Sequence, residues 1–145
     1  MGVLLQLLLS TVLVLVTILL HLGGIAALLL LIRRRADASG KRAIQHEIGA
    51  IVAAACGLFA LHGLEIWTYA IVYVLIGATI DFETALYFST SSYTTIGYGD
   101  VLLTPSWRIV GAIEGANGII LLGWSTAFFV AMVGRIGFVE RELGR

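Results

Sequence analysis

The sequence predicts an all-α integral membrane protein with three transmembrane helices, and two observations lead to this fold class. Hydrophobic residues make up 59% of the 145 residues, and charged residues make up only 12%. Soluble domains carry about 25% charged and about 45–50% apolar residues. The apolar residues fall into three runs, each long enough to cross a hydrocarbon core of about 30 Å as a helix. This composition excludes an ordinary soluble enzyme, a nucleic-acid-binding protein and a disordered chain.

The first apolar run extends from Val3 to Ile32 without a charged residue. It is too long for the apolar core of a cleavable signal peptide, which has about 7–15 residues and follows a basic segment. A short basic stretch follows at residues 33–42. We therefore expect residues 1–46 to form an N-terminal transmembrane helix and a basic cytoplasmic linker.

The second and third apolar runs predict helices over residues 47–80 and 107–135, with a short tail after the last helix. Between them, Asp81 is a good N-cap for a helix over 82–93. Twelve residues rise only about 18 Å as a helix, so this segment cannot cross the bilayer alone. Residues 47–145 are therefore expected to form one module of two spanning helices joined by a re-entrant segment.

The placement of basic residues predicts the orientation of the chain. Eight of the nine Lys and Arg residues lie either in the 33–42 stretch or in the tail from Arg135. Cytoplasmic loops carry an excess of Lys and Arg, so both places are expected in the cytoplasm. The N-terminus and the acidic segment 81–108 are then expected outside, in a multi-pass protein of the cell membrane.

Thr95-Ile96-Gly97-Tyr98-Gly99 follows the short helix. Alternating glycines allow backbone angles that other residues resist, so successive carbonyl groups can point to one side. Irregular backbone survives at membrane depth only when it is buried in protein or lines a water-filled path. A short re-entrant helix followed by such a segment indicates a pore.

The string Thr-Thr-Ile-Gly-Tyr-Gly-Asp at residues 94–100 resembles the selectivity filter of potassium channels, with Ile where many members have Val. The order of outer helix (47–80), pore helix (82–93), filter (95–99) and inner helix (107–135) is also similar to theirs. This resemblance implies a homotetrameric potassium channel fold, with potassium as the permeant ion, no cofactor and no enzymatic activity. It implies passive conduction across a lipid bilayer and no nucleic-acid partner.

The resemblance assigns roles to filter residues. Potassium would be bound by the backbone carbonyls of Thr95, Ile96, Gly97 and Tyr98 and by the Thr95 hydroxyl, with Gly99 closing the outer end. The Tyr98 ring would pack against the pore helix and hold the filter diameter. Nonselective relatives commonly change this position.

Further residues would support the filter from behind. Tyr87 and Phe88 match the positions of two bracing aromatic residues, and the Tyr87 hydroxyl is placed to reach Asp100. Phe88 has no hydrogen-bond donor. Ser91 matches a position at which some bacterial members carry an acid opposite Asp100, and serine is the weaker partner.

In the inner helix, Gly118 falls at the hinge glycine of the family and is expected to allow bending during opening. Gly111 and Gly115 form a small-xxx-small pair typical of close helix packing. The expected cavity and gate residues are, with Gly118, Ile119, Leu122, Thr126 and Phe129. For Phe129 a lipid-facing position is an equal alternative.

Ionisable residues inside the predicted helices are expected to avoid lipid and to find polar partners. For Glu114 the expected partner is the serine-rich pore helix, at Ser89, Ser91 or Ser92. His21 on the first helix and His62 on the second lie at depths of about 18 and 22 Å from the linker. We expect His21 to meet His62 or Glu65, although separate contacts with a serine, a carbonyl or water remain an alternative.

Two alternatives to a potassium-selective channel remain open. One is a weakly selective cation channel, and the other is a non-conducting membrane scaffold or accessory subunit. An intramembrane enzyme is disfavoured, because the chain lacks the His-Glu-x-x-His pattern of zinc proteases. With its single cysteine, Cys56, it also lacks an intrachain disulfide and a cysteine-ligated metal site.

Overall fold

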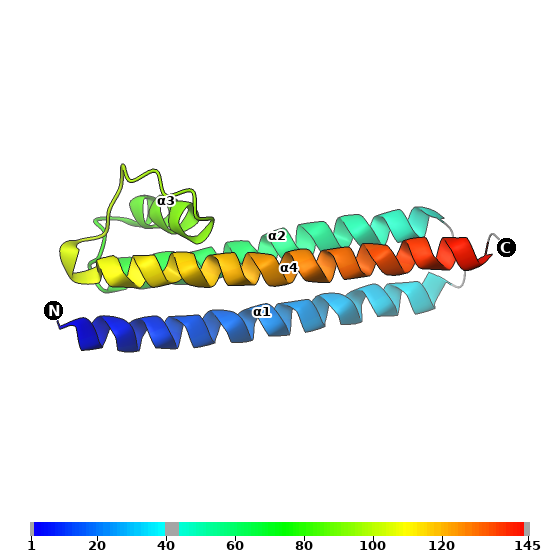
Figure 1. The fold of residues 1–145 in the computed structure, drawn as a ribbon, viewed down its shortest axis with the longest axis horizontal. Helices are drawn as coiled ribbons and strands as arrows, with labels where there is room; N and C mark the ends of the chain where they lie inside the picture. Colours follow the sequence, from blue (N-terminus) through cyan, green and yellow to red (C-terminus); the bar gives the residue numbers. More distant parts are fainter. Residues whose placement is uncertain (1, 40–43, 144–145) are drawn as a thin grey trace.

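Three long helices and one short helix make up the fold (Figure 1). The structure is a computed structural model that describes residues 2–39 and 44–143. The helices are α1 (Val3–Ser39), α2 (Ile44–Leu75), α3 (Phe82–Tyr93) and α4 (Arg108–Leu143), and one 3-10 turn, η1 (Pro105–Trp107), precedes α4. No strand occurs among the described residues.

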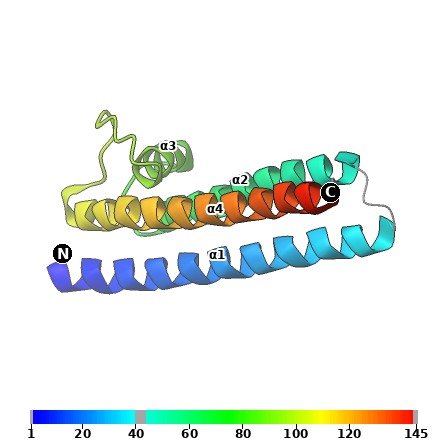
Figure 2. The same ribbon diagram turned by 45° about the vertical axis from the view of Figure 1, so that its right-hand side comes forward.

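The three long helices are apolar enough to span a membrane, over Val3–Arg34, Ile48–Leu75 and Pro105–Gly134. The predicted all-α fold with three transmembrane helices is therefore confirmed. The helices α1, α2 and α4 pack side by side along their length. Helix α3 packs on α2 and α4, on the side away from α1 (Figure 2).

The two ends of this bundle differ in charge. The N-terminus, α3 and the loop after it lie at one end, and the C-terminal ends of α1 and α4 lie at the other (Figure 1). Arg33 and Arg34 are exposed at the second end. Asp81, Glu83 and Asp100 are exposed at the first. Lys41 and Arg42 of the expected linker lie outside the described residues.

The observed helix ends differ from the predicted ones in three places. Helix α1 continues through Arg33 to Ser39, because the stretch Arg-Arg-Arg-Ala-Asp-Ala-Ser contains neither glycine nor proline. Helix α2 covers 44–75 rather than 47–80. Helix α4 begins after the Pro105 turn. It runs to Leu143 rather than ending at residue 135, because its last part also contains no proline.

The end of α2 has a clear local cause at Gly77. Its φ of +65° lies in the left-handed region that glycine adopts without strain. The Gly77 N–H donates to the Val74 carbonyl at 3.1 Å, and the Ala78 N–H donates to the Tyr73 carbonyl at 2.8 Å. These two bonds form a Schellman motif, which satisfies carbonyl groups at a helix end. The chain can therefore turn towards α3 five residues earlier than hydropathy indicates.

Helix α3 begins at residue 82 and ends at residue 93, as the sequence predicts. Asp81 caps it, accepting bonds from the Thr84 N–H and the Thr84 hydroxyl, each at 2.8 Å. These bonds lower the pKa of the Asp81 carboxyl. Because the α3 start is fixed by its own cap, the residues that follow α3 are held at a defined position.

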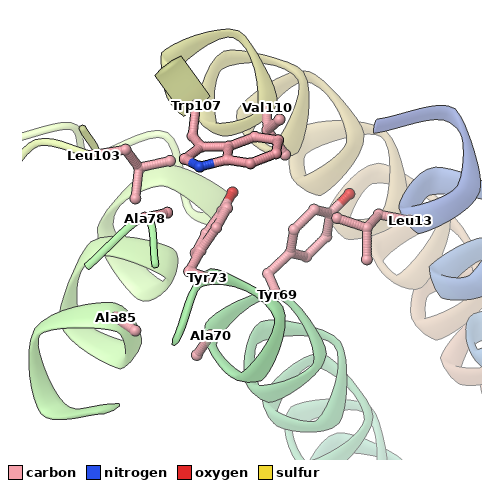
Figure 3. Packing of buried hydrophobic residues seen from close by; sticks show 9 residues of the cluster. All are labelled: Leu13, Tyr69, Ala70, Tyr73, Ala78, Ala85, Leu103, Trp107 and Val110. Atoms are coloured by element: carbon pink, nitrogen blue, oxygen red, sulfur yellow. The ribbon is translucent and has the colours of Figure 1, made fainter. Parts of the chain in front are cut away.

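The apolar core lies near the end of the bundle that carries α3. Two tyrosines of α2, Tyr69 and Tyr73, are fully buried there and lie below Trp107 and Val110 (Figure 3). The alanines Ala70 and Ala85 bring α2 and α3 together without large side chains between them. This cluster joins α2, α3, α4 and one residue of α1, Leu13.

The buried face of α1 is mostly polar. Its buried residues recur every three or four positions and are Gln6, Ser10, Leu13, Thr17 and His21. Most of its large apolar side chains are exposed instead. This arrangement suits a helix in lipid, where polar groups seek protein partners and apolar groups face the acyl chains.

Candidate functional site

The 95–99 segment has an alternating backbone. Thr95, Gly97 and Gly99 have φ values of +61°, +58° and +76°, and the residues between them do not have positive φ. Thr95 is the single non-glycine residue with positive φ in the described chain. A β-branched residue in this region is a genuine outlier, and such strain concentrates at functional sites.

The C-terminal end of α3 holds this backbone through hydrogen bonds. The Thr95 N–H donates to the Ser92 carbonyl at 3.0 Å, and the Gly97 N–H donates to the Ser91 carbonyl at 3.1 Å. The Tyr98 N–H donates to the Ser91 hydroxyl at 3.3 Å. Ser91 is buried and contacts the 95–99 backbone rather than Asp100.

The carbonyl groups of the 95–98 backbone accept no hydrogen bond from the residues that the structure describes. The side chains of Ile96 and Tyr98 are 56% and 70% exposed. The Tyr98 side chain is therefore largely uncovered by α3 of its own chain. The predicted packing of its ring against the pore helix is not seen within a single chain.

Tyr87 and Phe88 leave α3 in different directions. The Tyr87 hydroxyl donates to Asp100 at 2.7 Å, and this bond lowers the pKa of the Asp100 carboxyl. Phe88 turns towards the core, where its ring meets Tyr73 edge to face with centroids 5.6 Å apart. Tyr87 thus ties α3 to the residue that follows the 95–99 segment, and Phe88 packs behind α3.

Helix α4 approaches the backbone of α3 most closely at Gly118. A Cβ atom at Gly118 would overlap the carbonyl oxygen of Tyr93, the last residue of α3. At Gly115 a Cβ would come within 3.2 Å of the Ser92 carbonyl oxygen. At Gly111 it would meet the tip of the Phe88 ring instead. The hinge role of Gly118 stays a prediction, and the structure gives this glycine a packing role.

The expected cavity residues lie largely on the surface of the single chain. Ile119 is 57% exposed, Thr126 is exposed, and Leu122 and Phe129 are half-buried. The Thr126 hydroxyl donates to the Leu122 carbonyl of its own helix at 2.9 Å. These side chains are thus available to a partner or to water.

Glu114 is fully buried and joins three helices. The Tyr73 hydroxyl of α2 donates to it at 2.7 Å, and the Ser89 hydroxyl of α3 lies 2.5 Å from it. Ser89 also lies 3.0 Å from the Ile66 carbonyl. Of the three serines expected to reach Glu114, Ser89 does so.

His21, His62 and Glu65 lie together, and all four helices contribute to their surroundings. The Nδ1 atom of His21 lies 2.8 Å from Glu65 Oε1, and Nδ1 of His62 lies 3.0 Å from Glu65 Oε2. The Tyr93 hydroxyl of α3 donates to Glu65. Ser125 of α4 lies 2.9 Å from His62 Nε2 and 3.4 Å from His21 Nε2.

Two further polar contacts attach α1 to α4. The Asn117 amide donates to the Thr17 hydroxyl at 2.8 Å and to the Tyr69 hydroxyl at 3.2 Å. The Ile109 N–H lies 3.3 Å from Gln6 Oε1. Helix α1 is therefore fixed to the rest of the bundle at several depths.

Sequence reasoning did not single out Tyr73, Tyr93, Ser125 or Thr17. For Tyr73 and Ser125, the spacing of polar and aromatic residues along their helices was a usable signal. On α2 the residues His62, Glu65, Tyr69 and Tyr73 recur at intervals of three or four, as do Glu114, Asn117, Leu121 and Ser125 on α4. Such intervals put side chains on one helix face.

Replacement of Glu114 by alanine should destabilise the protein. It would leave the buried Tyr73 hydroxyl without its acceptor, at a cost of about 1–3 kcal/mol. Glu114→Gln keeps an acceptor oxygen and should cost less. The melting temperature of the purified protein in detergent measures both, with the exposed Glu83→Gln as control. A Glu114→Ala melting temperature equal to that of the unmodified protein would contradict the assigned contact.

Comparison with known protein families gives a match. A protein-family model described as "Ion channel" matches residues 60–135, which is more than half of the chain. This range contains α3, the 95–99 segment and the whole spanning part of α4. No curated protein and no solved structure matches.

Proposed function

Because the chain belongs to the ion channel family, whose model spans residues 60–135, we propose that it is one subunit of a homotetrameric, potassium-selective channel of the cell membrane. The family is one of ion-conducting membrane proteins and not a class of enzymes. In this proposal conduction is passive and needs no cofactor.

The observation that carries the proposal is the backbone of the 95–99 segment. Positive φ values alternate with negative ones along it. In a regular strand successive carbonyls point to opposite sides, and this alternation turns them to one side instead. The carbonyl oxygens accept no backbone hydrogen bond within the described chain, so they are available to replace the hydration shell of potassium.

The exposure of the same segment supports the proposed assembly of several chains. One chain contributes one row of oxygens, and a closed ring around an ion requires four such rows. Irregular backbone at membrane depth must be buried in protein or line a water-filled path. The exposed Tyr98 and Ile96 side chains provide the surface that neighbouring subunits would cover.

The proposed orientation places the N-terminus outside and the C-terminus in the cytoplasm. The basic ends of α1 and α4 lie together at one end of the bundle, as the positive-inside rule requires of a cytoplasmic face. The acidic residues Asp81, Glu83 and Asp100 then lie at the outer mouth, where their charge would attract cations.

Ion flux into liposomes tests the proposal. Purified protein should conduct potassium and rubidium far better than sodium, and crosslinking should show a tetramer. Equal potassium and sodium permeability would support a weakly selective cation channel instead. A tetramer without flux under any tested voltage and pH would support a non-conducting scaffold.

A further inference from the structure

We propose that His21, His62 and Glu65 form a buried binding site for a transition-metal ion of the Zn²⁺ class, which links α1 to the pore-forming helices. This site is separate from the 95–99 segment, and the proposal does not depend on ion conduction. It uses one residue of α1 and two of α2, with Tyr93 of α3 and Ser125 of α4 beside them.

The three side chains present their ligand atoms to one point. One imidazole nitrogen from each histidine and one Glu65 oxygen lie within 4.8 Å of one another. In a tetrahedral site with bonds of about 2.0–2.2 Å, neighbouring ligand atoms lie about 3.3 Å apart. The two short separations involve different Glu65 oxygens: His21 Nδ1 lies 2.8 Å from Oε1, and His62 Nδ1 lies 3.0 Å from Oε2. An ion bound through a single Glu65 oxygen therefore requires the three ligand atoms, which lie within 4.8 Å of one another, to close to about 3.3 Å.

The donor set selects the kind of metal. Two histidines and one glutamate are a known ligand set of zinc, with a fourth position left for water or another group. Imidazole ligands suit zinc, copper, iron and nickel, whereas calcium and magnesium prefer oxygen donors. The Tyr93 hydroxyl lies next to Glu65 and 2.9 Å from His62 Nδ1, close to that fourth position.

Ser125 provides the outer contact that metal-binding histidines require. A histidine that binds metal through Nδ1 carries its hydrogen on Nε2 and donates it to a nearby acceptor. The Ser125 hydroxyl faces Nε2 of both histidines, at 2.9 Å for His62 and 3.4 Å for His21. Its oxygen can accept both bonds through its two lone pairs.

Charge also favours a bound cation. The Glu65 side chain is fully buried at membrane depth, where an ionised carboxyl requires a partner of opposite charge. In the described part of the chain, its ion-pair partners are the two histidines and no Lys or Arg. A divalent metal would supply the missing positive charge. His62, with 12% of its side chain exposed, is the point at which an ion can enter the cluster.

The first test measures metal directly. Full-length protein in detergent is stripped with a chelator, equilibrated with Zn²⁺ and analysed for bound zinc. One ion per chain is expected, together with a higher melting temperature. Co²⁺ in place of zinc should give the visible d–d absorption of a tetrahedral site. A folded chain that binds no zinc, or a Co²⁺ spectrum typical of six oxygen ligands, would overturn the site.

Variants then locate the ion. His21→Gln, His62→Gln and Glu65→Gln should each lose the bound zinc, and Ser125→Ala should weaken binding by about 10–100-fold because it removes only the outer contact. His46→Gln, at the remaining histidine of the chain, should leave binding unchanged. Zinc retained by a folded His21→Gln variant, or lost on His46→Gln, would overturn the assignment. If the ligand variants do not fold, the Co²⁺ spectrum of the unmodified protein and the Ser125→Ala affinity still decide.

Discussion

Alanine at Gly118 is expected to destabilise the protein and to disturb the start of the 95–99 segment. The added Cβ would overlap the Tyr93 carbonyl oxygen, which belongs to backbone and cannot rotate away. Overpacking in a dense interior typically costs about 1–3 kcal/mol. Tyr93 directly precedes Thr94 and the 95–99 segment, so a displaced α3 end should also displace the proposed ion-binding carbonyls.

The experiment compares Gly118→Ala with Gly123→Ala on the same helix, where a Cβ would meet no atom within 4 Å. Gly118→Ala should lower the melting temperature and reduce both potassium flux and selectivity. Gly123→Ala should behave like the unmodified protein. If Gly118→Ala alters only the open probability, its role is that of a hinge. If Gly118→Ala changes neither the melting temperature nor the flux, the close approach of Gly118 to Tyr93 does not contribute to stability.

Replacement of Tyr98 by aspartate is expected to bring sodium permeability close to that of potassium. The tyrosine ring is 70% exposed in a single chain and is the largest side chain that the 95–99 segment offers to neighbouring subunits. Aspartate removes this packing surface and adds a negative charge beside the proposed ion path. Without the ring, the spacing between opposite carbonyl rows loses its support.

Tyr98→Phe is the matched control, because it keeps the ring and removes only the hydroxyl. Reversal potentials in mixed potassium and sodium solutions measure both variants. Tyr98→Phe should retain most of the potassium preference. Unchanged selectivity in Tyr98→Asp would show that the ring does not set the spacing of the 95–99 backbones, and it would weaken the proposal for a potassium-selective pore.

Hydropathy was sufficient to predict the spanning helices, since length and apolarity depend on sequence alone. The α3 boundaries were also predictable, because the Asp81 cap is local. The end of α2 was placed too late, since the apolar run continues past the Gly77 turn that terminates the helix. The signal available in the sequence was Gly77 at the C′ position, but the apolar residues that follow Gly77 obscured this signal.

The polar contacts could be predicted only in part. Depth along two helices suggested that His21 lies level with His62 and Glu65, and these residues are in contact in the structure. Depth does not give helix rotation, so Ser125 and Tyr93 were not foreseen as neighbours. The contact of Gly118 with Tyr93 depends on how α4 crosses α3, which no local pattern in the sequence specifies.

The polar stripe of α1 has a consequence for biosynthesis. Its contacts reach residues about a hundred positions later: Gln6 meets Ile109, Thr17 meets Asn117, and His21 approaches Ser125. A ribosome makes α1 first, so this stripe has no α4 partner until nearly the whole chain has been synthesised. The span Val3–Arg34 contains an 18-residue stretch with a mean hydropathy of 2.8, so α1 is apolar enough to enter the bilayer on its own despite the stripe. The contacts of α1 with α4 must therefore form late, after α4 has left the translocation machinery, whereas the contact of His21 with Glu65 of α2 can form earlier.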